Sequence, residues 1–168
     1  TVVPPPRGHR PLQRASLLAG LSGSGPAVGP DVVGYVRHAA TDEEAALLET
    51  EPGTEVVTME RLRRADGEPI ALMRNLVPAD LAPGREDLEE HGLYEMLRAA
   101  GAVPVTATQV IGARNATAKE AEALDERRRA ALLTATRTAY DSTGRVIEYG
   151  SHIYRASRYS FSTTLFSG

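Results

Sequence analysis

EVVTMERLRRADGEPIALMRNLV, residues 55–77, is the stretch that decides the fold. Two runs with the composition of β-strands flank Asp66-Gly67, and Asp-Gly between such runs is a strong local signal for a β-hairpin. We therefore predict strands over 55–65 and 69–77. Hairpins of this kind build antiparallel sheets.

The length of the hairpin turn determines which side chains share a face of the sheet. A two-residue turn would pair Arg63 with Ile70 and would place Met73 on the face opposite Arg61. A three-residue turn would bring Met73 beside Arg61, so that both line one surface. We predict the second arrangement.

The remainder of the chain continues the same pattern of strands, hairpins and short helices. TDEE at 41–44 and TAKE at 117–120 are capping boxes, and they predict helices that end near 48 and 124. A third helix is expected over 92–100, with Gly101 just beyond its end, and 78–90 is expected to be a polar connector with a helical turn at 78–81. Further strands are expected over 32–39, 103–113, 132–140, 145–155 and 158–165. Six or seven strands without βαβ alternation predict an α+β fold, an antiparallel sheet flanked by short helices.

Composition excludes several classes of function. The 168 residues contain no cysteine, which excludes disulfide scaffolds, thiolate metal sites and thiol catalysis. Four scattered histidines leave little for a metal site, so no metal or cofactor is expected. The net charge of −3 argues against nucleic-acid binding by this chain itself. No apolar run is long enough to span a membrane, and no motif indicates a reaction or a catalytic residue, so we expect a soluble, cytoplasmic protein that is not an enzyme.

The hairpin and five later segments resemble a known family. Pro52-Gly53 followed by MERLRRADGEPI at 59–70 resembles the signature stretch of the UTRA effector domain of GntR/HutC-type bacterial transcription regulators. Further resemblances follow in the family's order over about residues 30–166: GLYEML (92–97), IGARNAT (111–117), RTAYD (137–141), GRVIEY (144–149) and RASRYSF (155–161).

The resemblance implies a fold, partners and a domain organisation. The fold would be that of chorismate lyase, an antiparallel sheet with flanking helices that enclose a small-molecule pocket. Such domains bind a metabolite effector, form homodimers and leave operator DNA to a separate N-terminal winged helix-turn-helix domain. Residues 1–30 are rich in Gly and Pro and would be the leader after that absent domain, while 31–168 would be the effector-binding domain.

Arg61 and Arg63 are the first candidate ligand residues. They are two apart on an expected strand, so their side chains share a face. Two neighbouring guanidinium groups repel one another unless an anion lies between them, and the resemblance implies that this pair holds the acidic group of the effector. The alternative is an exposed, solvated pair at the sheet edge.

Glu148, His152 and Tyr154 also share one face of an expected strand. Gly150 between them would leave room for a ligand to approach the backbone. The resemblance implies effector contacts for Glu148 and Tyr154, and His152 is added because it lies on the same face. The alternative is a polar outer face, with Ile147 and Ile153 forming the core on the other side.

Two further positions bear on the ligand. Tyr94 matches a contact position of the family, with a helix-core aromatic as the alternative. Relatives that bind amino-sugar phosphates carry Glu where this chain has Met73 and Ser where it has Gly92. Because Met73 cannot accept a hydrogen bond, we expect an effector that is more apolar than an amino-sugar phosphate and bears an acidic group.

The sequence therefore predicts the effector-sensing, dimerising domain of a GntR/HutC-type regulator. One alternative is a chorismate lyase-like enzyme that acts on a small carboxylate. Another is a dimerisation module whose pocket has lost its ligand, which apolar side chains filling the space between Arg61 and Tyr154 would favour.

Overall fold

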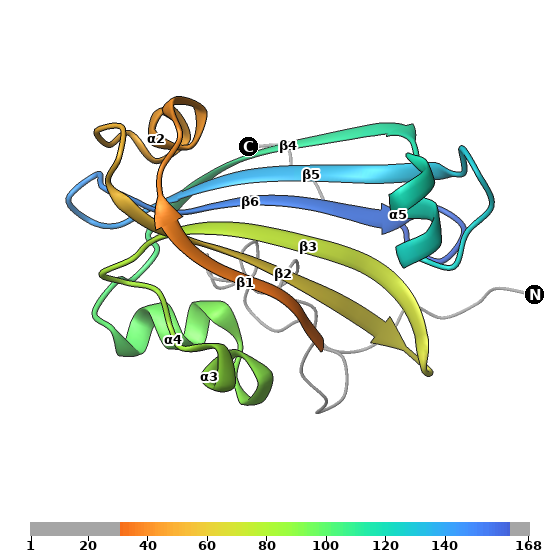
Figure 1. Cartoon of the computed structure of the whole chain (residues 1–168), viewed down its shortest axis with the longest axis horizontal. Helices are drawn as coiled ribbons and strands as arrows, with labels where there is room; N and C mark the ends of the chain where they lie inside the picture. Colours follow the sequence, from red (N-terminus) through yellow and green to blue (C-terminus); the bar gives the residue numbers. More distant parts are fainter. Residues whose placement is uncertain (1–30, 162–168) are drawn as a thin grey trace, which may run out of the picture.

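The computed structural model describes residues 31–161, and these form one antiparallel sheet with four short helices. The six strands lie side by side in the order β1-β2-β3-β6-β5-β4 (Figure 1). This confirms the predicted fold class. The strands are β1 (Asp31–Ala39), β2 (Glu55–Ala65), β3 (Glu68–Pro78), β4 (Thr106–Asn115), β5 (Ala131–Tyr140) and β6 (Val146–Arg155), and the helices are α2 (Asp42–Leu48), α3 (Arg85–Glu90), α4 (Leu93–Ala99) and α5 (Ala118–Ala123). No helix in residues 31–161 has the length and apolarity needed to cross a membrane.

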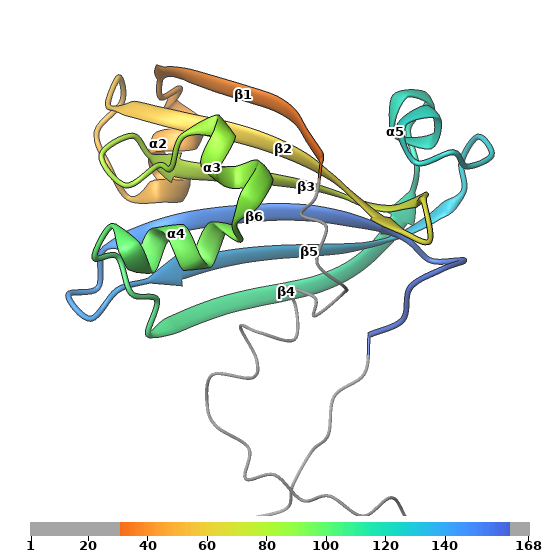
Figure 2. The same ribbon diagram turned by 90° about the horizontal axis from the view of Figure 1, so that it is seen from below.

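Helices cover both faces of the sheet, but only in part. Leu88 of α3 and Leu97 of α4 pack against Val57 and Val77 on one face, which we call the inner face. Helices α2 and α5 pack on the opposite, outer face, at its two ends (Figures 1 and 2). Within residues 31–161, the inner face extends beyond α4 without a covering helix, and the candidate site lies between α4 and this stretch (Figure 2).

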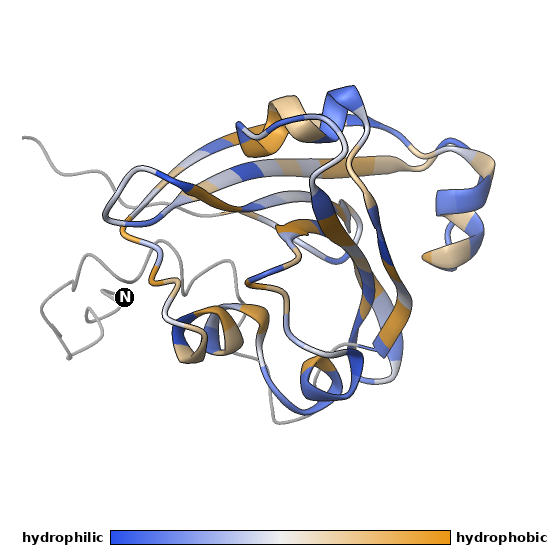
Figure 3. Ribbon diagram, turned by 60° about the vertical axis from the view of Figure 1, so that its left-hand side comes forward, coloured by the Kyte–Doolittle hydropathy of each residue, from blue (hydrophilic) through white to orange (hydrophobic). Residues whose placement is uncertain are grey.

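The capping boxes define the helix starts as expected. The Thr41 hydroxyl accepts the Glu44 N–H at 3.2 Å, and the Thr117 hydroxyl accepts the Glu120 N–H at the same distance. Helix α3 was not predicted, because REDLEE contains a single apolar residue and so gives no periodic signal. It is hydrophilic for most of its length (Figure 3), yet Leu88 is completely buried.

The β2–β3 hairpin has the predicted register but not the predicted turn. Its turn has two residues, Asp66 and Gly67, both with positive φ. Ile70 is an extra residue on β3, a β-bulge that shifts the pairing by one residue. Arg61 consequently faces Met73. The three-residue turn was wrong, and the bulge produces the same pairing.

A second bulge changes the β6 side chains. Ile147 has no partner of its own on β5, because Ala139 pairs with Glu148 and Tyr140 with Val146. The bulge lets Ile147 join the core beneath α4, on the same side as Glu148. The expectation that Ile147 and Ile153 share the opposite face is therefore wrong for Ile147, while Ile153 does pack against α5.

Two strand predictions differ from the structure. β4 begins at Thr106 rather than at 103, since Pro104 lacks the N–H that a strand ladder needs. Residues 158–161 form no strand, because the chain turns where the Arg158 N–H donates to the Arg155 carbonyl at 3.0 Å. The remainder of that expected strand, 162–165, and the expected leader, 1–30, lie outside the described residues.

Candidate functional site

Six polar side chains meet at the centre of the inner face, and each is at most 9 % exposed. Burying this many polar groups is costly unless they are paired, so such a cluster needs a physical explanation. We call it the polar cluster. Its members are Arg61 (β2), Asn75 (β3), Tyr94 (α4), Arg137 (β5), Glu148 and His152 (β6).

Glu148 is the hub of the polar cluster and is completely buried. Its carboxylate accepts hydrogen bonds of 2.6 Å from the Tyr94 hydroxyl and 2.6 Å from Asn75 Nδ2. Arg137 Nε lies 3.7 Å from Glu148 Oε2, and its guanidinium stacks 4.5 Å from the centre of the Tyr94 ring. These contacts tie α4 to three strands of the sheet.

Arg61 joins the cluster through Asn75. Its Nη2 donates to Asn75 Oδ1 at 2.9 Å, so the amide links Arg61 on one side to Glu148 on the other. Asn75 Nδ2 also lies 3.3 Å from His152 Nε2. Sequence reasoning missed Asn75, although its spacing of two from Met73 inside an apolar strand places a polar group on the same face.

The absence of a side chain at Gly150 leaves the space that the polar cluster occupies. A Cβ atom there would lie 2.6 Å from Glu148 Oε1 and 3.0 Å from His152 Nε2. The space above Gly150 is thus filled by side chains of the protein itself. The expectation that a ligand approaches the backbone at this glycine is wrong. Arg137, which pairs with Gly150 across β5 and β6, was also missed.

The polar cluster carries an excess of positive charge. Burial and the neighbouring Arg137 and Arg61 lower the pKa of His152 to about 3, so its imidazole is neutral at physiological pH. Burial lowers the pKa of Arg61 to about 10, which leaves it protonated. Two guanidinium groups therefore face one carboxylate, Glu148.

Two unpaired hydrogen-bond donors of the polar cluster also favour the binding of an anion. Within the described residues, Arg61 Nε and Arg137 Nε are buried and have no hydrogen-bond acceptor. A buried donor without an acceptor costs about 1–3 kcal/mol, more when it is charged. The arrangement is therefore suited to an anion that accepts from Arg61.

Arg63 and Met73 flank Arg61 on the inner face. Met73 lies between Arg61 and His152 in the sheet and is 8 % exposed. Arg63 is half-buried opposite Ala71, and within residues 31–161 it makes no hydrogen bond or ion pair. The alternative of an exposed arginine pair is wrong for Arg61.

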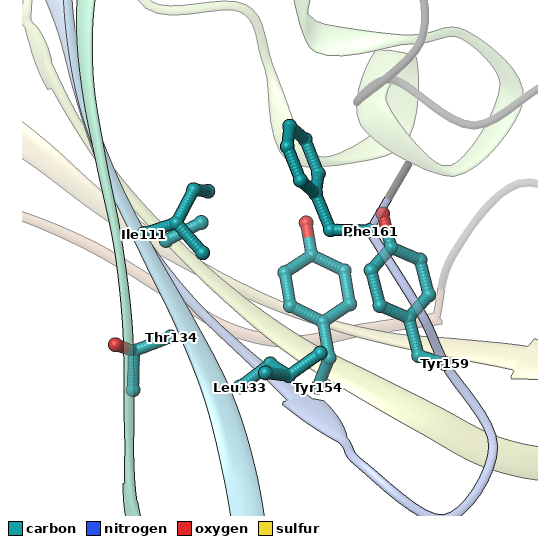
Figure 4. A pocket seen from close by; sticks show the side chains of 7 residues that line it. Ile111, Leu133, Thr134, Tyr154, Tyr159 and Phe161 are labelled. Atoms are coloured by element: carbon teal, nitrogen blue, oxygen red, sulfur yellow. The ribbon is translucent and has the colours of Figure 1, made fainter. Parts of the chain in front are cut away.

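An apolar pocket adjoins the polar cluster beside Tyr154 (Figure 4). It has room for about one water molecule and is lined by Ile111, Leu133, Thr134, Ala135, Tyr154, Tyr159 and Phe161. Burial raises the pKa of the Tyr154 hydroxyl to about 12, and that hydroxyl lies 3.4 Å from His152 Nδ1. Tyr154 is therefore a wall shared by the pocket and the cluster.

The structure thus brings the predicted site residues together on one face. Those at the cluster are Arg61, Met73, Tyr94, Glu148 and His152, with Tyr154 at its junction with the pocket and Arg63 at its margin. Residues 31–161 contain no group of three side chains placed to hold a metal ion.

Comparison with known proteins gives a consistent set of relatives. The model of the UTRA domain matches residues 24–160. The HTH-type transcriptional repressor PhnF of Mycolicibacterium smegmatis is 26% identical over 98% of this chain and 68% of its own length. The crystal structure of the PhnF effector domain superposes with a TM-score of 0.77 at 25% identity, covering 83% of this chain and 88% of that chain.

Two solved structures from other bacteria extend this set. A Streptomyces coelicolor protein provisionally described as a transcriptional regulator is 46% identical, with a TM-score of 0.76 over 80% of this chain and 90% of that chain. A GntR-family transcriptional regulator from Enterococcus faecalis is 28% identical, with a TM-score of 0.74 over 80% of this chain and 98% of that chain.

Proposed function

The chain belongs to the UTRA domain family, and from that premise we propose that it senses a small acidic metabolite for a GntR/HutC-type transcription regulator. A domain of this family in a GntR regulator has an effector-sensing, regulatory role. The proposal adds the chemistry of the effector, the residues that hold it and the assembly in which it acts.

The observation that carries the proposal is the unpaired charge of Arg61. Arg137 has Glu148 as an ion-pair partner, whereas the partner of Arg61 is the neutral amide of Asn75. An isolated buried charge is unfavourable until it is paired. We therefore assign the acidic group of the effector to Arg61, with Arg63 beside it.

In this proposal, helix α4 transmits the effect of ligand binding to the rest of the regulator. Tyr94 and Arg137 contact one another and both contact Glu148. An anion that draws Arg61 away from Asn75 changes the hydrogen bonds that Asn75 makes to Glu148. In this proposal the effector favours one placement of α4 over another, which is a population shift.

We further propose that the domain acts as a homodimer paired along β4. β4 is an edge strand with ten consecutive regular pairs to β5, and its Val110 side chain is 62% exposed. The other edge, β1, is interrupted by a bulge at Val33. Bulges protect an edge from pairing, so β4 is the edge better suited to a second copy.

DNA contact is assigned to another part of the regulator. The match covers 68% of PhnF, so about a third of that repressor has no counterpart here. In this proposal operator DNA is bound by an N-terminal helix-turn-helix domain, in keeping with the net charge of −3. The effector domain is a sensor and not an enzyme.

A thermal-shift assay with a panel of small carboxylates and phosphates tests the proposed function. We expect at least one acid to raise the melting temperature of the wild type and of Arg74→Met, a matched control whose arginine is exposed on the outer face beside Glu60. The same acid should leave Arg61→Met unchanged and should be recovered chemically intact. An acid that stabilises Arg61→Met as much as the wild type would contradict the assignment.

A further inference from the structure

We propose that the domain has a second ligand site, a cleft beside Glu49 that binds a small organic cation, an alkylammonium ion with a short apolar chain. The cleft lies where α2 packs on the outer face, and it shares no lining residue with the polar cluster. Its ligand is opposite in charge to the acidic effector. The site is independent of the proposed function.

The cleft has room for a small ligand. Its volume is about 160 Å³, and it is partly open to solvent. An apolar cavity of about 150 Å³ accepts a benzene ring, so a chain of four carbons fits. Three segments meet at the cleft: the end of α2 with the loop after it, the facing ends of β2 and β3, and the turn before β6. The lining residues are Leu48, Glu49, Thr50, Thr54, Val56, Pro78, Gly144, Arg145 and Val146.

The floor of the cleft is apolar. Leu48, Val56 and Val146 are each at most 3 % exposed and belong to one core cluster. Pro78, at the end of β3, is also buried. An alkyl chain that lies on these side chains is removed from water, and this favours binding in proportion to the apolar area covered.

The rim of the cleft carries hydrogen-bond acceptors. Within residues 31–161 the Glu49 carboxylate makes no hydrogen bond or ion pair, whereas Glu44 and Glu55 are paired with His38 and Arg37. The Thr50 hydroxyl donates to the Thr54 hydroxyl at 3.2 Å. Both hydroxyl oxygens keep lone pairs that can accept, and an ammonium group has three donors and no acceptor.

The C-terminal end of α2 adds to this preference for a cation. The helix has no basic residue in its last turn. The carbonyl groups of Leu47 and Leu48, its last two residues, accept no hydrogen bond among the residues that the structure describes. Free carbonyl groups give the end of a helix partial negative charge, so a positive charge is favoured there.

Glu49 itself stands at an unfavourable position. Its backbone is left-handed, with φ 52° and ψ 44°, a conformation that glycine adopts more easily at the end of a helix. A carboxylate there is also repelled by the helix carbonyl groups. Costly conformations of this kind are often retained at ligand sites, and a bound cation would offset the repulsion.

The donors at the cleft are already occupied, which disfavours an anion. Arg145 donates to Asp80 at 2.7 and 2.9 Å, and this pairing lowers the pKa of Asp80 and raises that of Arg145. The backbone N–H groups of Gly144 and Arg145 both donate to Asp141. Since Arg145 and Asp80 neutralise one another, Glu49 is left as the net charge of the cleft, which matches a monocation.

Titration of the ¹⁵N-labelled 168-residue chain with n-butylammonium, followed by amide NMR, tests the site. We expect saturable shifts at millimolar concentration that centre on residues 48–56 and 144–146. Butanol and butyrate have the same chain length without the positive charge and should bind at least tenfold more weakly. Methylammonium has the charge without the chain and should bind at least threefold more weakly.

Variants of two glutamates test the role of the carboxylate. Glu49→Gln keeps the shape of the side chain and removes its charge, so it should weaken n-butylammonium binding at least tenfold. Glu43→Gln is the matched control, because Glu43 is an exposed glutamate of α2 that does not line the cleft. Glu43→Gln should leave the Kd unchanged, and so should Arg61→Met, which alters the polar cluster.

Four outcomes would overturn the proposed cation site. They are no saturable shift with n-butylammonium at millimolar concentration, shifts that centre on other residues, butanol or methylammonium binding as tightly as n-butylammonium, and equal effects of Glu49→Gln and Glu43→Gln.

Discussion

The Tyr94 hydroxyl donates a 2.6 Å hydrogen bond to Glu148 Oε2, and this bond joins α4 to the centre of the sheet. Glu148 is completely buried, and burial raises the pKa of Tyr94 further above its usual range. The tyrosine therefore stays protonated and remains a donor. Helix α4 is held by a charged hydrogen bond in addition to its apolar face.

Removing this donor should be costly. We expect Tyr94→Phe to lower the free energy of unfolding by roughly 1–3 kcal/mol, because it leaves a buried carboxylate short of one donor. Urea denaturation measures the loss. Tyr35→Phe is the matched control, since Tyr35 donates to the Pro83 carbonyl at 2.9 Å from a half-buried position. If Tyr35→Phe lowers the free energy of unfolding as much or more, the Tyr94 hydrogen bond is no more stabilising than a half-buried one.

His152 should make the domain sensitive to acid. Its pKa is about 3 in the folded protein and near 6.5 in an unfolded chain. Between these values the unfolded chain binds a proton that the folded chain does not, so the free energy of unfolding falls as pH decreases. Each pH unit costs about 1.4 kcal/mol, so going from pH 6.5 to about 4.5 should cost roughly 3 kcal/mol from this residue.

Denaturation of variants across this pH range isolates the histidine. His152→Gln should lose stability less steeply on acidification than the wild type. His91→Gln, which alters an exposed histidine, should follow the wild-type curve. Parallel curves for the wild type and His152→Gln would mean that the buried imidazole is protonated in the folded protein.

Gly150 should tolerate no side chain. A Cβ atom would lie 2.6 Å from Glu148 Oε1, so Gly150→Ala must displace the carboxylate or the strand. We expect a loss of about 1–3 kcal/mol in thermal or urea unfolding. Gly92→Ala, where no atom lies within 4 Å of the added methyl group, should change stability by far less. Similar losses at the two glycines would argue against close packing above Gly150.

A lysine placed on edge strand β4 should disrupt the proposed dimer, whereas a lysine on the other edge strand, β1, should not. Val110→Lys on β4 should convert a dimer to a monomer in sedimentation velocity, because a charge on an edge strand opposes pairing. Val36→Lys on the other edge should leave the dimer intact, although Val36 is almost equally exposed at 57%. If the wild type is a monomer, or if both variants dissociate the dimer, the proposed pairing along β4 is wrong.

The six strands and three of the four helices of the described residues followed from local signals that the structure confirms. Asp66-Gly67 gave the hairpin, and the Thr-x-x-Glu boxes at Thr41 and Thr117 gave the starts of α2 and α5. Those interactions lie within four residues, so the sequence contains both partners. Helix α3 depends instead on burying Leu88 against the sheet, which no pattern in REDLEE indicates.

The bulges were not predictable from alternation. Ile70 and Ile147 each insert one residue into a strand whose apolar pattern is compatible with regular pairing. A bulge reverses the face of the residues beyond it, which is why Ile147 was placed on the wrong side. The predicted pairing of Arg61 with Met73 was right although the predicted turn was wrong. A bulge at Ile70 shifts the pairing by one residue, as a three-residue turn would have done.

The site was predictable as a face of the sheet but not as a network. The even spacing of Glu148 and His152 placed them on one strand face, and the family resemblance directed attention to Arg61 and Tyr94. Asn75 and Arg137 were missed because their roles depend on pairing between strands that are distant in the sequence. Tyr159 was expected in a strand, and it instead stacks on Tyr154 at the pocket.

The central claim is that Arg61 holds the acidic group of the effector. A crystal structure of the domain with the acid that gives the largest shift in the thermal panel tests it most directly. We expect an acid oxygen within hydrogen-bond distance of Arg61 Nε, which has no acceptor among the described residues. An acid bound elsewhere, with Arg61 Nε still without an acceptor, would contradict it.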